Sequence, residues 1–298
     1  MRLEPRWIVL DLADTGTGDM MVHSIGGRPC ERTMRRAIKA GELRLDREGA
    51  LAIVNYANTR ACNLPGVHAE HHIVVHPEYG PTAIAIWLHE DPPTERPVLN
   101  SWVLDMDALT TVTAGDDVSI IGDGRHEGEQ RPVQDLWRWL SPPDATALVM
   151  DYKRSIVEPD NAWTGIEWTL HPPDAEPVHL FSGGRLRVQG SNRLIVGTSV
   201  VLDKRTEQPP DLMGPLVAFS GITLAIVNRD AQTALTSVGA DAPLSYQALH
   251  DLVSDYDLHA TGALEVTLDG TRFDAEVVPL TAADPGPATV MLRRKETQ

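Results

Sequence analysis

Residues 68–76 read HAEHHIVVH and hold four histidines in nine positions. Histidine is a common metal ligand and titrates near neutral pH, so this segment could bind a metal or respond to pH. On a helix, His68, His72 and His76 would lie on one face. The β-branched run HHIVVH and the turn PEYG behind it instead predict one strand of a hairpin, in which His71 and His72 point to opposite faces.

The strand interpretation limits the metal chemistry. His72 and His76 would lie about 13 Å apart along a strand, too far to share one ion. A turn at residues 77–80 places His76 beside Pro81 and His72 beside Ala85, and it brings His68 opposite His89. The pair of His68 and His89 is therefore the candidate for a shared ion or proton, and the sequence predicts no other metal site.

Catalytic motifs are not found in the sequence. It has no G-x-S-x-G, H-E-x-x-H, G-x-x-x-x-G-K-[ST] or G-x-G-x-x-G pattern. The segment GDGRHEGE at 122–129 holds possible acids and bases in Asp123, Arg125, His126, Glu127 and Glu129, but its glycines and polarity predict a surface loop. We therefore expect no enzyme activity. The two cysteines, Cys30 and Cys62, are expected to be buried free thiols.

Tryptophans gather in the middle of the chain, where five of the seven lie between residues 102 and 168. Such side chains can form the core of a small sheet or line a ligand pocket, because both are apolar and aromatic. The pocket hypothesis combines tryptophans from a strand, a helix and a later strand with two residues on the face of that later strand. These predicted ligand-binding residues are Trp102, Trp137, Trp168, Ile166 and Leu170.

The length of 298 residues favours two or three domains. Two polar segments that contain Pro-Pro, at 89–100 and 203–215, are typical of linkers. We therefore predict three domains, at 1–96, 97–208 and 209–298.

Each predicted domain has a strand pair, then helices, then closing strands. In the middle domain the sequence predicts strands at 101–106, 109–114, 163–171, 177–190 and 193–203 and helices at 131–140 and 144–157. In the third domain it predicts strands at 221–230, 233–238 and 289–294, a hairpin with an Asp-Gly turn over 263–280, and a helix at 243–257 with Ser245 as its N-cap. The first domain is predicted with strands at 6–12 and 20–26, helices at 31–40 and 47–61, and the histidine hairpin at its end. The expected fold class is α+β, with three antiparallel sheets that each carry helices on one face.

The charge of the chain limits its partners. A net charge of −16 disfavours binding to nucleic acid and to anionic membranes, which attract basic proteins. No apolar run approaches the length of a membrane span, and the first residues lack the features of a signal peptide, so we expect a cytoplasmic location. One basic run, with Arg32, Arg35, Arg36 and Lys39 at helical spacing, forms either a solvated face or a surface for an anionic partner.

Two segments resemble PAS domains. LWRWLSPPDATALV resembles the region where a Pro-Asp pair opens a helix, and RLIVGTSVVLDKRTEQ resembles the last PAS strand with its polar tail. The whole chain is similar to an actinobacterial family of cytoplasmic proteins built from tandem PAS- or GAF-like domains without an output domain.

This resemblance implies a sensor, in which the helix-covered face of a sheet binds a small molecule or only packs. The flavin and haem motifs of PAS domains are missing, so the cofactor stays unknown. Two functions remain open: a signal-transduction protein that binds a small molecule, a protein partner or both, and an interaction scaffold with packed, ligand-free domains. A homo-oligomer is compatible with either.

Overall fold

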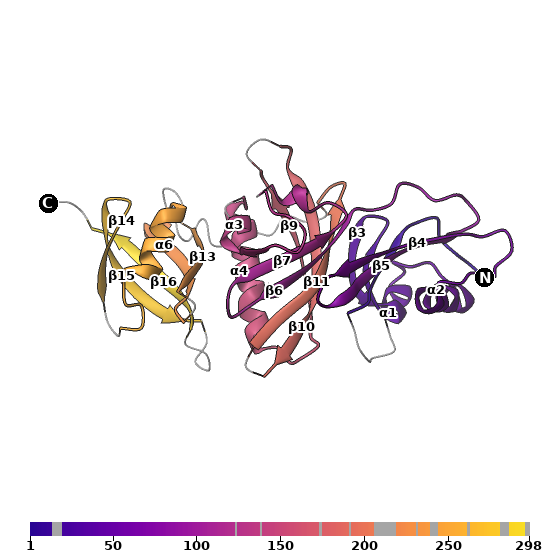
Figure 1. Cartoon of the computed structure of the whole chain (residues 1–298), viewed down its shortest axis with the longest axis horizontal. Coiled ribbons are helices and arrows are strands. Elements are labelled where there is room, and N and C mark those ends of the chain that lie inside the picture. The colour runs from indigo at the N-terminus through magenta and orange to yellow at the C-terminus, as the bar shows by residue number, and fades with distance from the viewer. Residues whose placement is uncertain are drawn as a thin grey trace.

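The computed structural model describes residues 1–13, 20–122, 124–137, 139–172, 175–190, 192–205, 219–230, 232–238, 244–260, 263–280 and 286–295. The fold class is α+β, as predicted, with three antiparallel sheets. In each sheet the first strand lies between the second strand and the last strand. Each sheet therefore has opening strands, then helices, then closing strands, with two closing strands in the first sheet and three in each of the others (Figure 1).

Sheet A is formed near the N-terminus and has the strand order β3-β2-β1-β5-β4. Its strands are β1 (Ile8–Asp11), β2 (Met21–Ile25), β3 (Arg28–Thr33), β4 (His68–His76) and β5 (Gly80–His89). Two helices, α1 (Met34–Lys39) and α2 (Arg47–Thr59), connect β3 to β4. They cover one face of the sheet, where Leu10, Ile84 and Ile86 pack against Ile53 and Tyr56.

Sheet B follows, in the strand order β8-β7-β6-β11-β10-β9. Its strands are β6 (Leu99–Asp105), β7 (Thr110–Gly115), β8 (Gln130–Pro132), β9 (Trp163–Leu170), β10 (Val178–Gln189) and β11 (Asn192–Leu202). A short 3-10 helix η1 (Val118–Ile121) and the helices α3 (Gln134–Trp137) and α4 (Pro142–Val157) lie between β7 and β9. Ser141 caps α4 by accepting a hydrogen bond from the backbone N–H of Asp144.

Sheet C has the strand order β13-β12-β16-β15-β14. Its strands are β12 (Ile222–Asn228), β13 (Thr233–Val238), β14 (Leu264–Leu268), β15 (Thr271–Pro279) and β16 (Pro287–Arg294). Helix α6 (Tyr246–Ser254) covers one face, and Ser245 caps it as predicted, by accepting from the backbone N–H of Ala248. Sheet C lies within residues 209–298, as sheets A and B lie within 1–96 and 97–208. The second predicted boundary, between 208 and 209, lies outside the described residues.

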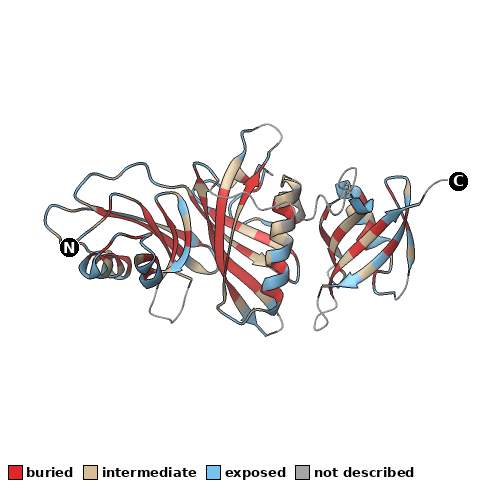
Figure 2. Ribbon diagram, turned by 180° about the vertical axis from the view of Figure 1, so that it is seen from behind, coloured by how far each residue is buried: buried red, intermediate tan, exposed pale blue. Residues whose placement is uncertain are grey.

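The sheets and helices stack in layers along the long axis of the molecule (Figure 1). Sheets A and B face each other across a shared core that includes Trp7, Trp87, Leu99, Phe181 and Val200. Buried residues run along the facing strands of both sheets (Figure 2). The first two sheets therefore share a core that neither completes alone.

We call each sheet together with its helices a unit, counted along the chain. Sheet C contacts the helices of the second unit. Ile226 of β12 and Leu235 of β13 pack in one cluster with Val133, Tyr152 and Ile156. Helix α4 thus has sheet B on one side and sheet C on the other.

Glycines allow the sheets to approach. On the side of sheet B that faces sheet A, a Cβ on Gly183 would lie 2.5 Å from the ring of Trp163 and 3.2 Å from the ring of His23. The ring of His23 packs edge-on against Phe181, with 4.6 Å between the ring centroids. Since no larger residue fits at position 183, both rings lie directly on the backbone of β10.

A buried ion pair crosses the same interface. Nε of Arg185 on β10 donates to Asp11 of β1 at 2.6 Å, and the two side chains are only 7% and 4% exposed. The guanidinium also lies 5.7 Å from the centre of the Trp163 ring and donates to the carbonyl of Asn161 at 3.1 Å. Charges in such a position are tolerated only when they are paired.

Two element predictions need correction. The first unit has a third strand, β3, at the start of the segment predicted as a helix over 31–40, because its residues 28–33 pair with β2. The predicted helix over 131–140 starts late, since residues 130–132 form β8 against β7 and only Gln134–Trp137 are helical. Both missed strands are short edge strands rich in polar residues, so they lack the alternating apolar pattern that marks strands elsewhere.

We predict that Asp11→Ala lowers the free energy of unfolding by about 3 to 5 kcal/mol, because it leaves Arg185 buried without its carboxylate. The double substitution Asp11→Leu with Arg185→Met should recover part of this loss. Chemical denaturation followed by tryptophan fluorescence measures both. As a control, Glu265→Ala removes one of the two carboxylates that pair with the half-exposed Lys295 and should change stability by less than about 1 kcal/mol. Equal effects of Asp11→Ala and Glu265→Ala would contradict the role of the buried pair.

His23 should make stability depend on pH. Burial lowers the pKa of this imidazole from 6.5 to about 4, while its Nε2–H donates to the carbonyl of Thr198 at 2.8 Å. Below pH 6.5 His23 is protonated in the unfolded chain, whereas in the folded chain it stays neutral until about pH 4. The free energy of unfolding therefore falls as the pH drops through this range.

The variant His23→Gln keeps an N–H donor and cannot titrate. Between pH 6.5 and about 4, the unfolding free energy of this variant should fall less than that of the wild type. The difference between the two falls should be roughly 3 kcal/mol. Denaturation curves recorded across this range for both proteins test the prediction, and parallel curves would refute it.

Candidate functional site

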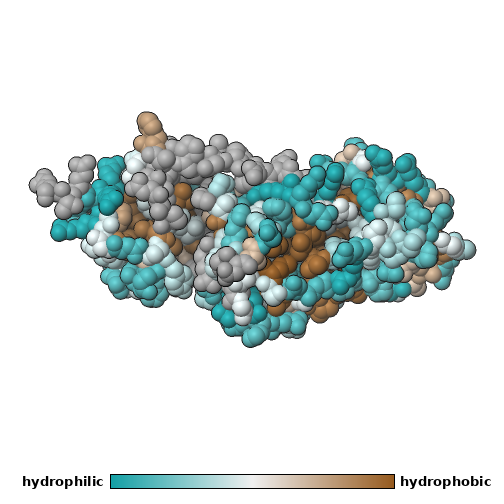
Figure 3. All heavy atoms as spheres, turned by 90° about the horizontal axis from the view of Figure 1, so that it is seen from above, coloured by the Kyte–Doolittle hydropathy of each residue, from teal (hydrophilic) through white to brown (hydrophobic). Residues whose placement is uncertain are grey.

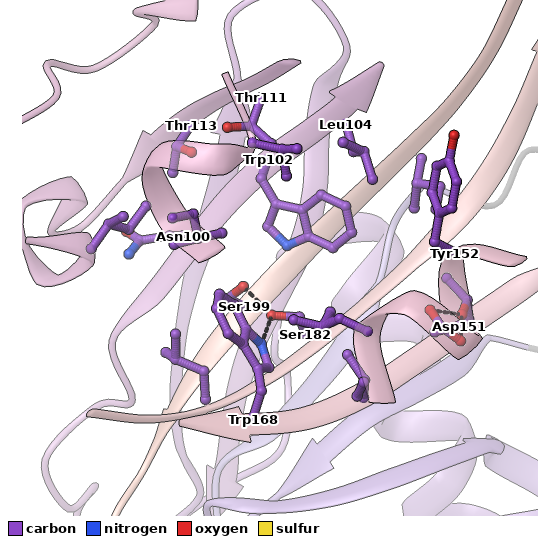
Figure 4. A pocket seen from close by; sticks show the side chains of 18 of the residues that line it. Asn100, Trp102, Leu104, Thr111, Thr113, Asp151, Tyr152, Trp168, Ser182 and Ser199 are labelled. Atoms are coloured by element: carbon purple, nitrogen blue, oxygen red, sulfur yellow. Dashed lines mark hydrogen bonds between the residues drawn. The ribbon is translucent and has the colours of Figure 1, made fainter. Parts of the chain in front are cut away.

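A cavity of about 110 Å³ lies between sheet B and the helices α3 and α4. Its lining comes from β6, β7, β9, β10 and β11 on the sheet side, and from η1, α3 and α4 on the other. Most of the exposed lining is apolar, from residues such as Leu104, Leu148, Ile166, Leu180 and Ile195. A set of polar side chains enters this apolar space, as shown in Figure 4.

Trp102 lies in the cavity because the strand beside it carries a glycine. A Cβ on Gly197 of β11 would lie 2.5 Å from the indole of Trp102, so the ring can lie across β11 only at a glycine. The indole N–H is buried and has no hydrogen-bond partner among the described residues. In Figure 4 this nitrogen is on the side of the ring that faces Ser199 and Ser182. A buried donor without a partner costs free energy, which an acceptor in the cavity would restore.

Two serines and a tryptophan form a hydrogen-bonded chain on the floor of the cavity (Figure 4). Nε1 of Trp168 donates to Oγ of Ser182 at 2.7 Å, and Oγ of Ser182 lies 2.6 Å from Oγ of Ser199. Since Ser182 already accepts from Trp168, only one hydroxyl proton is needed between the serines. The second proton of the pair has no acceptor among the described residues and is available to a ligand.

A positive charge lies at another part of the cavity wall. Arg125 is 4% exposed, and its Nη1 donates to the hydroxyls of Thr111 at 3.0 Å and Thr113 at 2.9 Å. The two threonines are neighbours on the same face of β7, so they hold the guanidinium against the sheet. The predicted surface loop at 122–129 is thus exposed at His126 and Glu127 but turns Arg125 inward.

A carboxylate approaches the cavity from α4. Asp151 accepts a hydrogen bond of 2.6 Å from the hydroxyl of Thr164 on β9 and pairs with Arg154 one turn along the helix. Burial raises the pKa of Asp151 above its usual value, against the opposing effects of Thr164 and Arg154. The cavity therefore contains both hydrogen-bond donors and an acceptor.

The structure brings together three of the five predicted ligand-binding residues. Trp102, Ile166 and Trp168 line the cavity. Leu170 shares the strand face of Trp168 and is fully buried, but it packs in the neighbouring apolar cluster and does not line the cavity. The backbone of Trp137 ends α3, whereas its side chain lies outside the described residues.

The sequence interpretation missed the polar part of the site, which comprises Asn100, Thr111, Thr113, Arg125, Asp151, Thr164, Ser182 and Ser199. The sequence contained a signal for two of them. Thr164 lies four residues before Trp168 and Ser182 two residues after Leu180, so each lies on the same strand face as its apolar neighbour. Arg125 carried no such signal, since it lies in a glycine-rich connection.

The histidine hairpin has the predicted register at its open end. His68 lies opposite His89, and His72 lies opposite Ala85. At the turn the prediction is wrong, because a register shift between Val74 and Val75 places His76 opposite Gly80 and not beside Pro81. His71 bonds to the hydroxyl of Tyr56 at 3.0 Å on the helix side, whereas His72 faces Asp116 of the second unit at 2.9 Å.

His89 lies 3.2 Å from Asp91, while His68 is exposed. Within the described parts of the chain, no three His, Cys, Asp or Glu side chains are grouped so that they could hold a metal. Likewise, no described helix is long and apolar enough to cross a membrane.

Comparisons with known proteins inform the fold. No protein-family model and no curated protein sequence matches the chain. The structure is similar to the crystal structure of an uncharacterized protein from Mycobacterium tuberculosis, with a TM-score of 0.61, 13% identity, and coverage of 99% of this chain and 97% of that one. The three-sheet fold is therefore shared over the whole length of both proteins.

Two further solved structures match less well. One is an RNA-binding light-oxygen-voltage receptor, with a TM-score of 0.27, 9% identity, and coverage of 66% of this chain and 95% of that one. The other is the extracellular domain of a histidine kinase, with a TM-score of 0.20, 8% identity, and coverage of 65% of this chain and 66% of that one. Neither likeness is close enough to support an inference about this chain.

The serine pair gives a stability prediction. Ser182→Ala removes the acceptor of the buried Trp168 N–H and should lower the free energy of unfolding by about 1 to 3 kcal/mol. Ser199→Ala has the same burial but leaves the bond from Trp168 to Ser182 intact, so its effect should be smaller. Urea denaturation of both variants measures the difference. An equal or larger loss in Ser199→Ala would contradict the importance of Ser182 as the acceptor of the buried Trp168 N–H.

Proposed function

We propose that this protein is a sensor of the PAS-like type, which binds a small molecule in the cavity between sheet B and the helices α3 and α4. The observation that carries the proposal is the buried N–H of Trp102, which has no partner in the described part of the chain, beside the spare hydroxyl proton of Ser182 and Ser199. Two donors that converge in an apolar cavity favour a ligand with one hydrogen-bond acceptor.

The size of the cavity is compatible with a ring-sized ligand. An engineered apolar cavity of about 150 Å³ in another protein binds benzene, and this one measures about 110 Å³. Trp102 and Trp168 offer flat faces for stacking, and Ile166 and Leu180 complete an apolar wall. The proposed ligand is therefore a small, planar, mostly apolar molecule with a carbonyl or similar acceptor.

We do not propose catalysis. A serine nucleophile needs a general base within hydrogen-bond distance. The hydroxyls of Ser182 and Ser199 contact each other and the indole of Trp168, and none of these groups is a base. The proposal is therefore limited to binding. A resident cofactor stays unspecified, and a cytoplasmic location without nucleic-acid or membrane partners stays a prediction.

A bound molecule could alter the contact between the second and third units. Tyr152 of α4 lines the cavity and also packs with Leu235 of sheet C. Its hydroxyl donates to the backbone carbonyl of Met106 at 3.0 Å, so the ring is held between the two. A ligand that shifts α4 would therefore shift the surface that sheet C contacts. A protein partner would bind one of the two arrangements more tightly than the other.

The alternative function is an interaction scaffold. In that case the cavity is a packing defect, and the three units only present surfaces to other proteins. The two functions differ in whether any ligand binds with the selectivity that the polar groups demand.

The test compares two single-ring probes of similar shape, pyran-4-one, which has a carbonyl acceptor, and benzene, which has none. The wild-type protein should bind pyran-4-one about 3- to 10-fold more tightly, the usual net effect of one hydrogen bond. Trp102→Phe keeps an aromatic ring but removes the N–H, so the preference should fall towards equal affinity. Quenching of tryptophan fluorescence and thermal shift measure the affinities.

Ile166→Trp, which fills the cavity from β9, is the matched control and should abolish binding of both probes. Circular dichroism confirms that the variants are folded. Binding that survives in Ile166→Trp would place the probe elsewhere. No binding of either probe to the wild type, together with no small molecule in native mass spectra of the purified protein, would leave the scaffold function.

A further inference from the structure

A second hollow lies on the first unit and shares no lining residue with the cavity of sheet B. It is a cleft of about 600 Å³ between the N-terminal segment, the turn from β2 to β3 and the connection from α1 to α2. Four arginines line it, Arg2, Arg6, Arg28 and Arg44, and we call it the arginine cleft. Apart from two glutamates, the rest of its lining is leucine, isoleucine, proline and glycine.

The two acids of the cleft are already engaged. Glu4 is 8% exposed, accepts from Nε of Arg6 at 2.9 Å and from a second nitrogen of the same guanidinium, and accepts from the backbone N–H of Arg44. Glu42 pairs with Nε of Arg32 at 3.1 Å and accepts from Sγ of Cys30 at 3.1 Å. Their negative charges are therefore offset within the protein.

The thiol remains a donor because burial, the largest cause, and the neighbouring Glu42 raise the pKa of Cys30 to about 12. The Cys30 side chain is therefore neutral at physiological pH and does not compete with an anionic ligand for the arginines.

Three positive charges remain in the cleft. Arg2, Arg28 and Arg44 are exposed, and none of them forms an ion pair with another described residue. The surrounding sequence is also basic, since residues 28–47 hold seven Arg and Lys but only three Asp and Glu. In a chain with a net charge of −16, this is a local concentration of positive charge in a concave surface.

The cleft is held in shape before any ligand arrives. Glu4 joins the N-terminal segment to the connection before α2 through Arg44, and Nη2 of Arg6 donates to the carbonyl of Glu42 at 3.1 Å. The backbone of Arg2 lies against the first turn of α2, where a Cβ on Gly49 would be 2.1 Å from the carbonyl oxygen of Arg2. The backbone that carries Arg2 and Arg44 is therefore already fixed, so that binding of an oxyanion has to order only their side chains.

We infer that the arginine cleft binds a small organic anion through phosphate or carboxylate groups that together carry at least two negative charges. The fork of an arginine side chain matches both groups in a bidentate manner. A volume of about 600 Å³ is that of a small-molecule site. The negative charge of the rest of the chain repels nucleic acids and anionic membranes, which present extended charge, and leaves a small anion as the favoured occupant. This site goes beyond the proposed sensor cavity and does not depend on it.

Isothermal titration calorimetry with pyrophosphate, citrate and uncharged glucose tests the inference on the full chain. Pyrophosphate or citrate should bind with a dissociation constant in the millimolar range or below, and glucose should not bind. Tighter binding of pyrophosphate would indicate a phosphate site, and tighter binding of citrate a carboxylate site. The double variant Arg28→Ala with Arg44→Ala should weaken binding at least about tenfold.

The matched control is Arg36→Ala with Lys39→Ala, which removes the same charge from the exposed face of α1 outside the cleft. It should change the affinity less than about twofold, because unspecific attraction by net charge is weak at physiological salt. The inference is overturned if neither anion binds the wild type, or if the two double variants lose affinity equally. Because the four substituted side chains are exposed, both double variants should stay folded. Circular dichroism checks that they do.

Discussion

The close approach of bulky rings to both faces of sheet B depends on a row of glycines across that sheet. Gly165 of β9 lies opposite Gly183 of β10, and Gly184 lies opposite Gly197 of β11. On one face this row accommodates Trp163 and His23 at the interface with sheet A, and on the other it accommodates Trp102 in the cavity. A side chain at these positions would push the rings outward, so the packing of the two sheets and the shape of the cavity have a common steric cause.

The same arrangement explains why the cavity can hold polar groups in fixed positions. Its floor is a sheet with a second sheet behind it, and the buried pair of Arg185 and Asp11 fixes that sheet from the rear. Ser182 and Ser199 therefore lie on backbone that is packed on both faces and cannot relax easily. The opposite wall is α4, a single helix between two sheets. We regard the floor as the rigid part of the proposed sensor and α4 as the part that can move.

The charged groups serve different purposes in different places. Between the sheets, Arg185 is paired and buried, so it contributes to structure. In the cavity, Arg125 is held by two threonines against β7. In the arginine cleft, the arginines surround acids that are already engaged, which leaves positive charge for a partner. In a strongly negative chain, these arginines form a local concentration of positive charge on the first unit.

Local pattern determined much of this protein. The alternating runs and the PEYG turn were enough to predict the hairpin in which His68 faces His89, and the parity of β9 put Ile166 and Trp168 on one face, because both depend only on neighbours along the strand. Only the tertiary structure decided which second layer covers each face. The unbroken apolar run AIAIWL of β5 indicates burial on both sides but does not identify the second layer, since sheet A and sheet B meet through residues far apart in sequence. The inward turn of Arg125 and the burial of His23 have the same origin, because each is set by contacts that no local pattern encodes.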